Sequence, residues 1–306
     1  MYDLIIIGGG PGGISAGVYA SRKRLKTLFI TKEWGGQSTV SPDIHNWIGT
    51  VSISGNDLAK SLETHLKAYV DDVVTIIDNS LAVNATKIEG GFEVTLEDGS
   101  THQAKALLIA SGSKRRKLTV PGADTYDNKG LTYCASCDGP LFSGQDVAVI
   151  GGGNAGFETA AQLLAYTKSV TLLHHSDAFR ADPVTVEKVL SHPNMKAVTN
   201  AKTLEVLGET FVTGIRYADK EGVEHTLPVS GIFVEIGLIP NTDFVANLVE
   251  LDDFKRIKID PWTQQTNVPG VWAAGDCTNI KYHQNNISAG DAVRALEDVY
   301  VHLKAK

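Results

Sequence analysis

The sequence predicts an α/β protein made of two Rossmann-like domains, with the second domain inserted in the first. The main observation is an internal repeat: DLIIIGGGPGG at 3–13 returns as DVAVIGGGNAG at 146–156, an offset of 143 residues. Each copy begins with an apolar run, passes through a glycine-rich turn and continues into a helical pattern. A second apolar strand follows each helix, at 27–30 and at 170–173. A β-α-β unit of this kind implies parallel strands, so two such units imply two parallel sheets.

The helices after the glycine turns are predicted from apolar residues at helical spacing. These are Ile14, Val18 and Tyr19 in the first copy, and Phe157, Ala160, Ala161 and Leu164 in the second. The other expected elements are a helix with Leu58, Leu62, Leu66 and Tyr69 on one face, strands at 73–77, 91–96 and 107–110, a strand within 268–276, and a closing helix at about 288–304. A basic segment at 113–122 and a segment near 239–242 are expected to link the two domains.

The composition is that of an ordinary globular protein, and it argues against several classes of function. The 306 residues suffice for roughly two domains. A net charge of −7 disfavours binding to nucleic acid and to anionic membranes. No segment reaches the roughly 20 apolar residues of a membrane span, and the short apolar run at 4–7 lacks the basic leader of a signal peptide. We therefore expect a cytoplasmic protein that binds neither nucleic acid nor membrane.

Each glycine turn has the spacing G-x-G-x-x-G, which holds the pyrophosphate of a dinucleotide when it connects a strand to a helix. The first glycine permits a tight turn, the second lets the backbone approach the phosphates, and the third lets the helix pack closely. The N-terminus of the helix then offers unpaired N–H groups to the phosphates. The three positions are Gly8, Gly10 and Gly13 in the first copy, and Gly151, Gly153 and Gly156 in the second.

The acidic residue that commonly binds a ribose hydroxyl about 20 residues further on is less clear. In the first copy Glu33 lies 20 residues after Gly13. In the second copy the same offset gives Ser176, between His174 and Asp177. The second copy therefore shows neither a clear acid for NAD nor a pair of arginines for the 2′-phosphate of NADP.

A Cys-Ala-Ser-Cys tetrad, Cys134 to Cys137, lies shortly before the second glycine turn and is followed by Asp138. The chain has only three cysteines, and in a reducing compartment such a pair indicates catalysis or metal binding. At a helix N-terminus Cys134 is the candidate attacking thiolate and Cys137 the resolving thiol, while Asp138 is placed to shuttle a proton. A zinc half-site is the alternative, but no second pair of ligands has a suitable spacing, so we predict no metal. Cys277 is expected to be a buried packing thiol.

The two glycine turns, the segment 134–140 and the turn Ala274-Gly275-Asp276 together resemble the low-molecular-weight thioredoxin reductases, over essentially the whole chain. The sequence is most similar in style to the reductase part of the alkyl hydroperoxide reductase flavoprotein subunit, as in 133–156 and 231–237. The sequence does not include that subunit's additional thioredoxin-like module. The resemblance therefore implies a separate thioredoxin- or glutaredoxin-like protein as the partner.

The resemblance implies a homodimer with FAD in a discontinuous first domain, 1–115 and 246–306, and a pyridine nucleotide in a second domain, 116–245, that carries the dithiol. Around the flavin it implies, besides the first glycine turn and Glu33, the residues Gly36, Gln37, Asn46, Asp276 and Gln284. In such proteins the small domain rotates between two states. Cys137 would then form the charge-transfer contact with the flavin, and Cys134 would attack the partner's disulfide.

The nucleotide specificity departs from the pattern of this family. Members that use NADPH have His-Arg-Arg, three further residues and then Arg; this chain keeps His174 and Arg180 but lacks both central arginines. Gly156 replaces an alanine common in those members, and the Glu that peroxide-linked relatives have near His174 is missing. We therefore expect NADH or NADPH as the donor without deciding between them. Two alternatives remain open: reduced ferredoxin or another protein as the donor, and a flavin-binding redox sensor without turnover.

Overall fold

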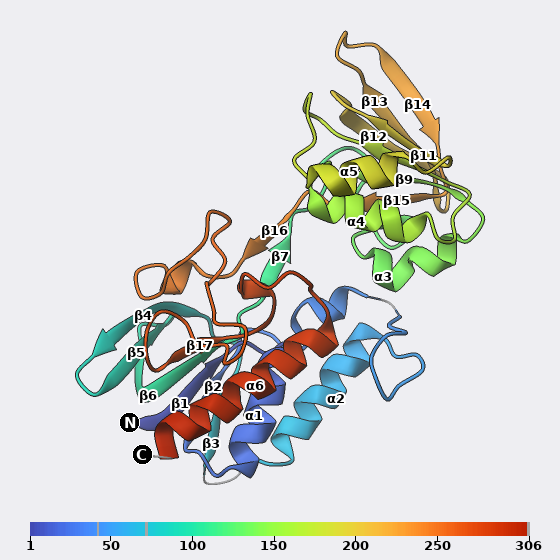
Figure 1. The fold of residues 1–306 in the computed structure, drawn as a ribbon. Helices are drawn as coiled ribbons and strands as arrows, with labels where there is room; N and C mark the ends of the chain where they lie inside the picture. Colours follow the sequence, from blue (N-terminus) through green and yellow to red (C-terminus); the bar gives the residue numbers. More distant parts are fainter. Residues whose placement is uncertain (42, 71–72, 305–306) are drawn as a thin grey trace. The chain divides into compact units, whose positions relative to one another are not determined.

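The computed structural model describes residues 1–41, 43–70 and 73–304, and the chain divides into two compact units (Figure 1). Unit 1 comprises 1–114 and 239–306, and unit 2 comprises 115–238. The chain thus leaves unit 1 once, builds unit 2 and returns. The sequence-based boundaries were 115/116 and 245/246, and the assignment of one cofactor to each domain stays a prediction.

Unit 1 is built on a seven-stranded sheet in the order β3-β2-β1-β6-β5-β4, with β17 also paired to β6. Strands β1, β2, β3, β6 and β17 are parallel, whereas β4, β5 and β6 form an antiparallel meander. The strands are β1 (Tyr2–Ile7), β2 (Thr27–Ile30), β3 (Val74–Ile77), β4 (Ala82–Ile88), β5 (Gly91–Leu96), β6 (Thr101–Ile109) and β17 (Val271–Ala273). The helices are α1 (Pro11–Arg22), α2 (Gly55–Lys67) and α6 (Asn285–Lys304), with α1 between the other two (Figure 1).

The apolar run of β1 is continuous because the strand is buried on both faces of the sheet. Leu4 and Ile6 face the helices and share a core with Leu296 of α6. Ile5 and Ile7 face the opposite side and belong to a second core, which also contains Val245, Val249 and Ile257. Both faces of β1 are therefore covered. The glycine turn follows at the carboxyl end of the strand.

Trp272 on β17 is the largest fully buried side chain of the described residues. Its indole N–H donates a hydrogen bond to the Asp298 carboxylate on α6 at 2.8 Å. A buried tryptophan needs a partner for this one polar atom, and the bond supplies it. The contact therefore ties α6 to β17 as well as filling the core.

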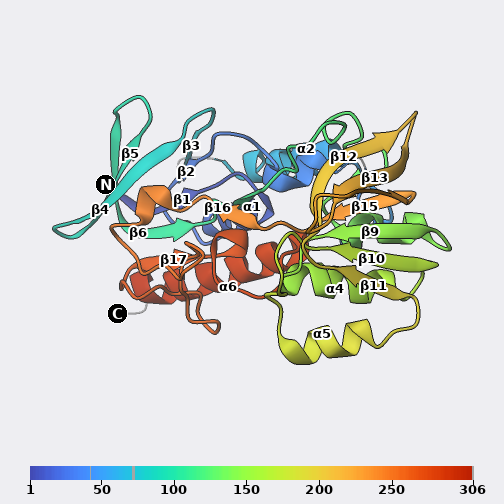
Figure 2. The ribbon, with the colours of Figure 1, turned by 90° about the horizontal axis from the view of Figure 1, so that it is seen from above.

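Unit 2 contains an all-parallel sheet of five strands in the order β11-β10-β9-β15-β8 (Figure 2). The strands are β8 (Leu131–Thr132), β9 (Asp146–Ile150), β10 (Ser169–Leu173), β11 (Met195–Val198) and β15 (Gly231–Val234). The helices are α3 (Ala135–Asp138), α4 (Asn154–Leu163) and α5 (Pro183–Leu190). A separate antiparallel sheet consists of β12 (Lys202–Gly208), β13 (Val212–Ala218) and β14 (Glu224–Pro228).

Both parallel sheets have a topological switch point, where the strand order reverses direction. In unit 1 the chain runs from β1 outward to β2 and β3, and then returns to β6 on the other side of β1. In unit 2 it runs from β9 to β10 and β11 and returns to β15. Dinucleotides bind outside the carboxyl ends of the strands at such points. The predicted α/β class with two Rossmann-like domains is confirmed.

The segments expected to link the domains form two short strands. They are β7 (Ser113–Arg115) and β16 (Leu238–Pro240), and they pair with each other. Several predicted elements begin earlier than expected: the helix placed at Leu58 starts at Gly55, and the closing helix placed at about 288 starts at Asn285.

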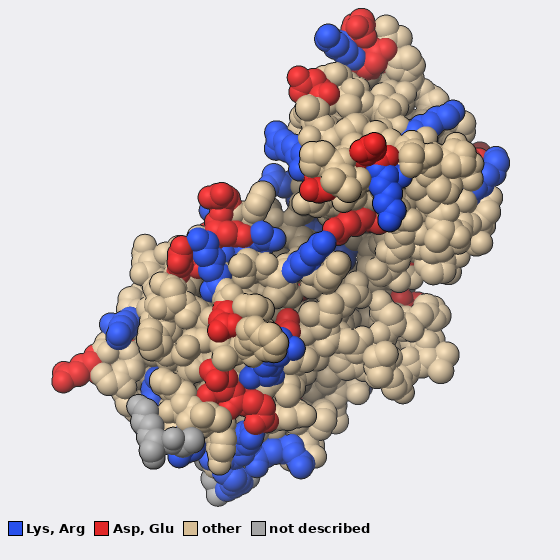
Figure 3. All heavy atoms as spheres, in the orientation of Figure 1, with Lys and Arg blue, Asp and Glu red and all other residues tan. Residues whose placement is uncertain are grey.

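No helix in the described parts of the chain is both long enough and apolar enough to cross a membrane. On the face shown in Figure 3, basic and acidic side chains are mixed. The described residues include exposed ion pairs, such as Lys32 with Glu97 and Lys168 with Asp146. Exposed pairs of this kind contribute little to stability.

Candidate redox centre and dinucleotide sites

The first glycine turn joins β1 to α1 and has the shape that a pyrophosphate requires. Gly8 has a φ of +124°, and a Cβ there would lie 2.1 Å from the carbonyl oxygen of Ala110. A Cβ on Gly13 would lie 1.8 Å from the carbonyl oxygen of Gly8, so α1 packs closely against the turn. Gly10 faces open space and precedes α1, whose first turn has no side-chain cap among the described residues. The N–H groups of this turn therefore fit the pyrophosphate of a dinucleotide, and FAD at this turn stays a prediction.

The second glycine turn joins β9 to α4 and repeats this geometry. Gly151 has a φ of +127°, and a Cβ there would lie 2.1 Å from the carbonyl oxygen of Glu235. A Cβ on Gly156 would lie 1.9 Å from the carbonyl oxygen of Gly151. Gly153 faces open space before α4, again with no side-chain cap in the described part of the chain. This turn also fits the pyrophosphate of a dinucleotide, and a pyridine nucleotide at this turn stays a prediction.

A polar side chain supports each turn from behind, and the two copies differ here. In unit 1 a Cβ on Gly9 would lie 2.1 Å from the hydroxyl oxygen of Thr31. In unit 2 a Cβ on Gly152 would lie 2.5 Å from the imidazole of His174. The two supporting residues follow their turns at the same distance along the chain, so the repeat extends to them.

Both ring nitrogens of His174 contact the backbone. Nδ1 accepts a hydrogen bond from the Gly152 N–H at 3.1 Å, and Nε2 lies 3.0 Å from the carbonyl oxygen of Ala178. This pattern requires the neutral tautomer with its proton on Nε2. Burial lowers the pKa of His174, which favours the same form. The ring therefore holds the glycine turn in place, and its contact with the nucleotide stays a prediction.

The segment after His174 curls back to the same turn. The backbone N–H of Arg180 donates to the carbonyl oxygen of Gly152 at 2.8 Å, and the Arg180 side chain is exposed. His175 and Asp177 are exposed as well. His174 and Arg180, the two residues retained from the family pattern, thus both form hydrogen bonds with the backbone of Gly152.

The predicted flavin residues after β2 also lie near their glycine turn. Glu33 is exposed, and its carbonyl oxygen accepts a hydrogen bond from the Thr31 hydroxyl at 2.6 Å. Gly36 and Gln37 begin the short 3₁₀ helix η1 (Gly36–Val40). A Cβ on Gly36 would lie 3.3 Å from the Cα of Gly10, so this helix runs directly against the turn.

The remaining predicted flavin residues lie in unit 1, and two of them are hydrogen-bonded to each other. The Asn46 amide donates to the side-chain oxygen of Gln284 at 3.0 Å. Asp276, in the 3₁₀ helix η4 (Gly275–Cys277), lies 3.3 Å from Nδ1 of His283 and accepts from the Ser288 hydroxyl at 3.4 Å. Sequence reasoning missed Ser288. Its position one turn into α6, beside the Asp276 turn, was not visible without the fold.

The two cysteines of the tetrad form a disulfide at the start of α3. Cys134 is the N-cap of this helix, and its sulfur accepts a hydrogen bond from the Cys137 N–H at 3.2 Å. The helix position predicted for the pair is therefore confirmed. Both cysteines are half-buried, so exposure does not distinguish an outer from an inner thiol. A zinc site would require both thiolates as ligands, whereas here the two sulfurs are bonded to each other.

Asp138 is the acid of this centre. It accepts a hydrogen bond from the hydroxyl of Thr132, whose oxygen in turn accepts the N–H of Cys134 at 3.2 Å. Burial raises the pKa of Asp138, while the Thr132 hydrogen bond and the charge of Arg115 oppose that shift. A carboxyl with a raised pKa is more readily protonated than an ordinary aspartate, as a general acid requires.

Glu235 is a functional candidate that sequence reasoning did not single out. It directly follows β15, and its carboxylate accepts a hydrogen bond from the Thr159 hydroxyl on α4 at 2.8 Å. Burial raises the pKa of Glu235 to about 7. Extending the repeat to the strand after the crossover could have found it, because Glu235 occupies the place of Ala110.

Cys277, in contrast, has the structure of a packing thiol. It is fully buried, and its sulfur lies 3.4 Å from the carbonyl oxygen of Ala274. Burial raises the pKa of this thiol to about 11. The expectation of a buried packing thiol is confirmed.

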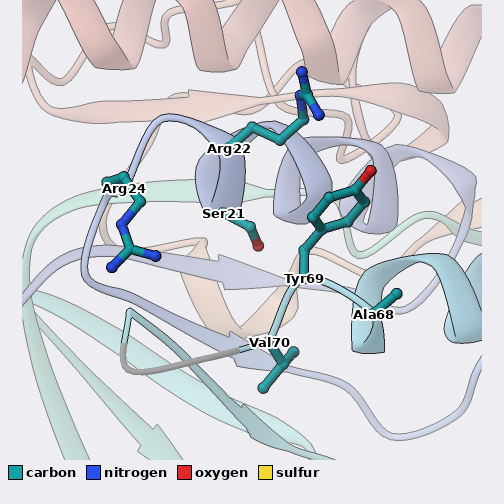
Figure 4. Close-up of a pocket in the computed structure, with 6 residues that line it drawn as sticks. All are labelled: Ser21, Arg22, Arg24, Ala68, Tyr69 and Val70. Carbon is teal, nitrogen blue, oxygen red and sulfur yellow. The ribbon is translucent and has the colours of Figure 1, made fainter.

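One surface pocket lies outside these sites. Figure 4 shows it at the C-terminal ends of α1 and α2, where Arg22 lies 5.8 Å from the centre of the Tyr69 ring. Its other lining residues are Ser21, Arg24, Ala68 and Val70. Because Gly10 marks the opposite end of α1, this pocket is not part of the dinucleotide site.

Comparisons with known proteins agree with these features. A profile of the pyridine nucleotide-disulphide oxidoreductases matches residues 2–290. The chain is 42% identical over 303 residues to the F component of alkyl hydroperoxide reductase from Staphylococcus aureus (strain MRSA252), covering 99% of this chain and 59% of that protein. It is 40% identical over 305 residues to a protein of Ferdinandcohnia aciditolerans named NADH dehydrogenase, covering 99% and 57%. The chain thus spans about three-fifths of the length of these relatives.

Among solved structures, the chain is similar to thioredoxin reductase from Streptococcus pyogenes MGAS5005. The identity is 32%, the TM-score is 0.89, and the match covers 100% of this chain and 99% of that one. The fold that carries the glycine turns and the disulfide is thus found in a related protein of nearly equal extent.

Proposed function

The chain belongs to the pyridine nucleotide-disulphide oxidoreductase family, whose members use FAD and NAD(P)H, and from that premise we propose that it is a disulfide reductase of the thioredoxin reductase kind. Its acceptor is the disulfide of a thioredoxin- or glutaredoxin-like protein. The observation that carries the proposal is the Cys134–Cys137 disulfide, which lies beside Asp138 in the unit that contains the second glycine turn. We further propose that the protein acts as a cytoplasmic homodimer.

FAD, when bound, supplies the means of taking two electrons from a reduced nucleotide and passing them to a disulfide. The Cys134–Cys137 bond then gains two electrons and two protons and becomes two thiols. Cys134, as a thiolate, attacks one sulfur of the acceptor disulfide and forms a mixed disulfide. Cys137 attacks the Cys134 sulfur, which re-forms the original bond and releases the acceptor with two thiols.

Asp138 is the residue that moves the protons in this proposal. Each turnover delivers two protons to the acceptor thiols, and a thiol must lose its proton before it attacks. The raised pKa of Asp138, the last residue of α3, and its hydrogen bond to Thr132 support this role. Thr132 also contacts the Cys134 N–H, so the acid and the first cysteine share one hydroxyl.

The test replaces the first cysteine. Cys134→Ser should retain FAD but lose reduction of a thioredoxin disulfide, measured by coupled reduction of an aromatic disulfide dye. Cys277→Ser is the matched control, since its thiol is fully buried within unit 1, and it should keep turnover. Retained turnover in Cys134→Ser would sink the assignment. Steady turnover by the unaltered protein would eliminate the redox-sensor alternative.

The donor is tested separately. We propose a pyridine nucleotide, supported by the second glycine turn and its open helix N-terminus. Stopped-flow reduction of the flavin by NADH, NADPH and reduced ferredoxin, side by side, gives the answer. Fast bleaching by ferredoxin together with no bleaching by either nucleotide would contradict the proposal.

A further inference from the structure

The switch point of unit 2 carries an acid where the switch point of unit 1 carries an alanine. The carbonyl oxygens of Ala110 and Glu235 take the same position, each 2.1 Å from where a Cβ would lie on the first glycine of its turn. Ala110 directly follows β6, and Glu235 directly follows β15. The backbones correspond at this position, so the difference between the two sites lies in the side chain.

A second difference accompanies the first. Thr159, whose hydroxyl binds the Glu235 carboxylate at 2.8 Å, lies 143 residues after Ala16, the same offset that separates the two glycine turns. Ala16 is fully buried and Ala110 nearly so. Two apolar positions of unit 1 are thus replaced in unit 2 by a hydrogen-bonded pair. The Thr159 hydroxyl uses one of the roughly four lone-pair positions of a carboxylate, so the group is able to accept another hydrogen bond.

The strand order indicates which part of a dinucleotide this carboxyl meets. In a Rossmann fold the pyrophosphate lies at the helix after the first strand, and the end of the second strand faces the ribose next to adenine. In unit 2 these places are α4 and the segment after β10. Strand β15 lies on the opposite side of β9 from β10. The end of β15, where Glu235 lies, is therefore on the nicotinamide side of the pyrophosphate site.

We propose that Glu235 is a positioning residue for the pyridine nucleotide. As a carboxylate supported by Thr159, it accepts a hydrogen bond from the nicotinamide half, whose donors are the ribose hydroxyls and the carboxamide N–H. This inference rests on the proposed use of a pyridine nucleotide by unit 2. It adds a contact to the nicotinamide half of the nucleotide, which neither the glycine turn nor the segment at 174–180 provides.

Protonation of Glu235 controls the proposed contact. Burial raises the pKa of this group to about 7; the Thr159 hydrogen bond and the Arg115 charge oppose the rise, and the Glu158 charge adds to it. The deprotonated form is the better acceptor, so binding favours it and lowers the pKa of the group. Nucleotide affinity should therefore increase as the pH rises through about 7, and binding near that pH should release a proton.

The test is calorimetric titration of the oxidised holoenzyme with NAD⁺ between pH 5.5 and 8.5. NAD⁺ does not reduce the flavin, and it lacks the 2′-phosphate that would titrate in this range. For the unaltered protein we expect the affinity to rise about tenfold, the change produced if binding lowers the pKa of Glu235 by one unit. In Glu235→Gln, which keeps the size of the side chain, the affinity should not change with pH.

Variants of two neighbouring residues should shift the pH dependence of NAD⁺ affinity in opposite directions. Glu158→Gln removes a negative charge and should shift the midpoint to lower pH without changing its amplitude. Thr159→Val removes the donor and should shift it to higher pH. Retained FAD and an unchanged circular dichroism spectrum show that each variant is folded.

The outcomes separate this inference from the function on which it rests. A holoenzyme that binds neither NAD⁺ nor NADP⁺ would contradict both. A pH dependence that persists in Glu235→Gln, or an affinity of the unaltered protein that does not vary with pH, would contradict the role of Glu235 alone. A flat profile in Glu235→Gln with opposite shifts in the other two variants would support it.

Discussion

The two glycine turns of this chain have the same backbone and different surroundings. The φ angles of Gly8 and Gly151 are +124° and +127°. A Cβ on either glycine would lie 2.1 Å from a carbonyl oxygen. The third glycines, Gly13 and Gly156, are equally restricted, with Cβ positions 1.8 and 1.9 Å from a carbonyl oxygen. The turns differ in the side chains around them: Thr31, Ala16 and Ala110 in unit 1 correspond to His174, Thr159 and Glu235 in unit 2.

This comparison separates two tasks. The glycines fix a turn that any dinucleotide pyrophosphate can use, because its contacts are made by backbone N–H groups. The side chains at the three surrounding positions are free to differ, because backbone groups of the turn make the phosphate contacts. In unit 1 two of them are apolar and packed, whereas in unit 2 all three are polar. Substitutions of corresponding glycines should therefore have similar effects in the two units. Substitutions of the corresponding surrounding residues should have different effects.

The largest effects are expected for the first glycine of each turn. Gly8→Ala and Gly151→Ala each combine an unfavourable φ with a clash against a carbonyl oxygen, and should destabilise their own unit by more than about 3 kcal/mol. Gly8→Ala should lose FAD. Gly151→Ala should retain FAD and lose rapid flavin reduction by nucleotide. Flavin content after gel filtration and stopped-flow absorbance measure the two results, and loss of FAD from both variants would contradict the separation of tasks.

The next effect is the pH dependence of stability contributed by Glu235. Its pKa is raised from 4.5 to about 7 in the folded protein, so the folded state binds the proton more tightly than the unfolded state. The free energy of unfolding of unit 2 should therefore fall as the pH rises from about 4.5 to about 7, by at most about 3 kcal/mol. Glu235→Gln should lack this loss and be relatively more stable at pH 8.

Hydrogen exchange of peptides from β9 and β15, at pH 5 and pH 8, measures this difference after correction for the intrinsic exchange rate. Ala110→Gln, the corresponding position in unit 1, is the comparison. It introduces a polar side chain into an apolar site and should destabilise unit 1 at both pH values. An equal pH dependence in the unaltered protein and in Glu235→Gln would show that another group is responsible.

A smaller effect is expected for the residue behind the second turn. His174→Ala removes two backbone contacts and leaves a cavity, which should cost about 2 kcal/mol in unit 2. The variant should also bind nucleotide more weakly, while FAD stays bound. Calorimetry with NAD⁺ and the flavin spectrum together measure this. An unchanged affinity would indicate that the Gly152 N–H does not need its imidazole partner.

The smallest effect is expected for the corresponding residue of unit 1. Thr31→Val keeps the volume of the side chain and removes one hydrogen bond, to the carbonyl oxygen of Glu33, at a cost of about 1 kcal/mol. FAD should remain bound with a slightly faster dissociation rate, measured by transfer to an apoflavoprotein. A larger loss of stability in Thr31→Val than in His174→Ala would contradict the expected order of the two effects.

The parts of this structure that follow from local patterns could be predicted. The repeat specified both turns, their helices and the parallel sheets, because each signal is confined to about 30 residues. The sheet formed by β12, β13 and β14 was not predicted. Many residues of these strands are only partly buried, β14 is mostly exposed, and the strands carry charged residues such as Glu205, Arg216 and Glu224. An apolar alternation is therefore weak there.

The sites show the same limit. Asn46 and Gln284 lie 238 positions apart, and their direct hydrogen bond depends on the whole of unit 1. Their presence near the flavin was inferred from family resemblance. Glu235 was overlooked although the segment 231–237 contributes to the family resemblance, because the repeat was not followed as far as this strand. The register of β15 against β9 places Glu235 beside Gly151. The backbone contacts of His174 were likewise not evident, because a histidine near a nucleotide turn suggests a ligand before it suggests a support.

The buried Trp272, tied to α6 through Asp298, has a spectroscopic consequence. All four tryptophans of the chain, Trp34, Trp47, Trp262 and Trp272, lie in unit 1. Intrinsic indole fluorescence therefore reports on unit 1 alone, with the shielded Trp272 expected to emit at shorter wavelengths than Trp262, which is 85% exposed. Unit 2, with the disulfide and Glu235, is silent by this method, and a tryptophan introduced there would give it a signal of its own.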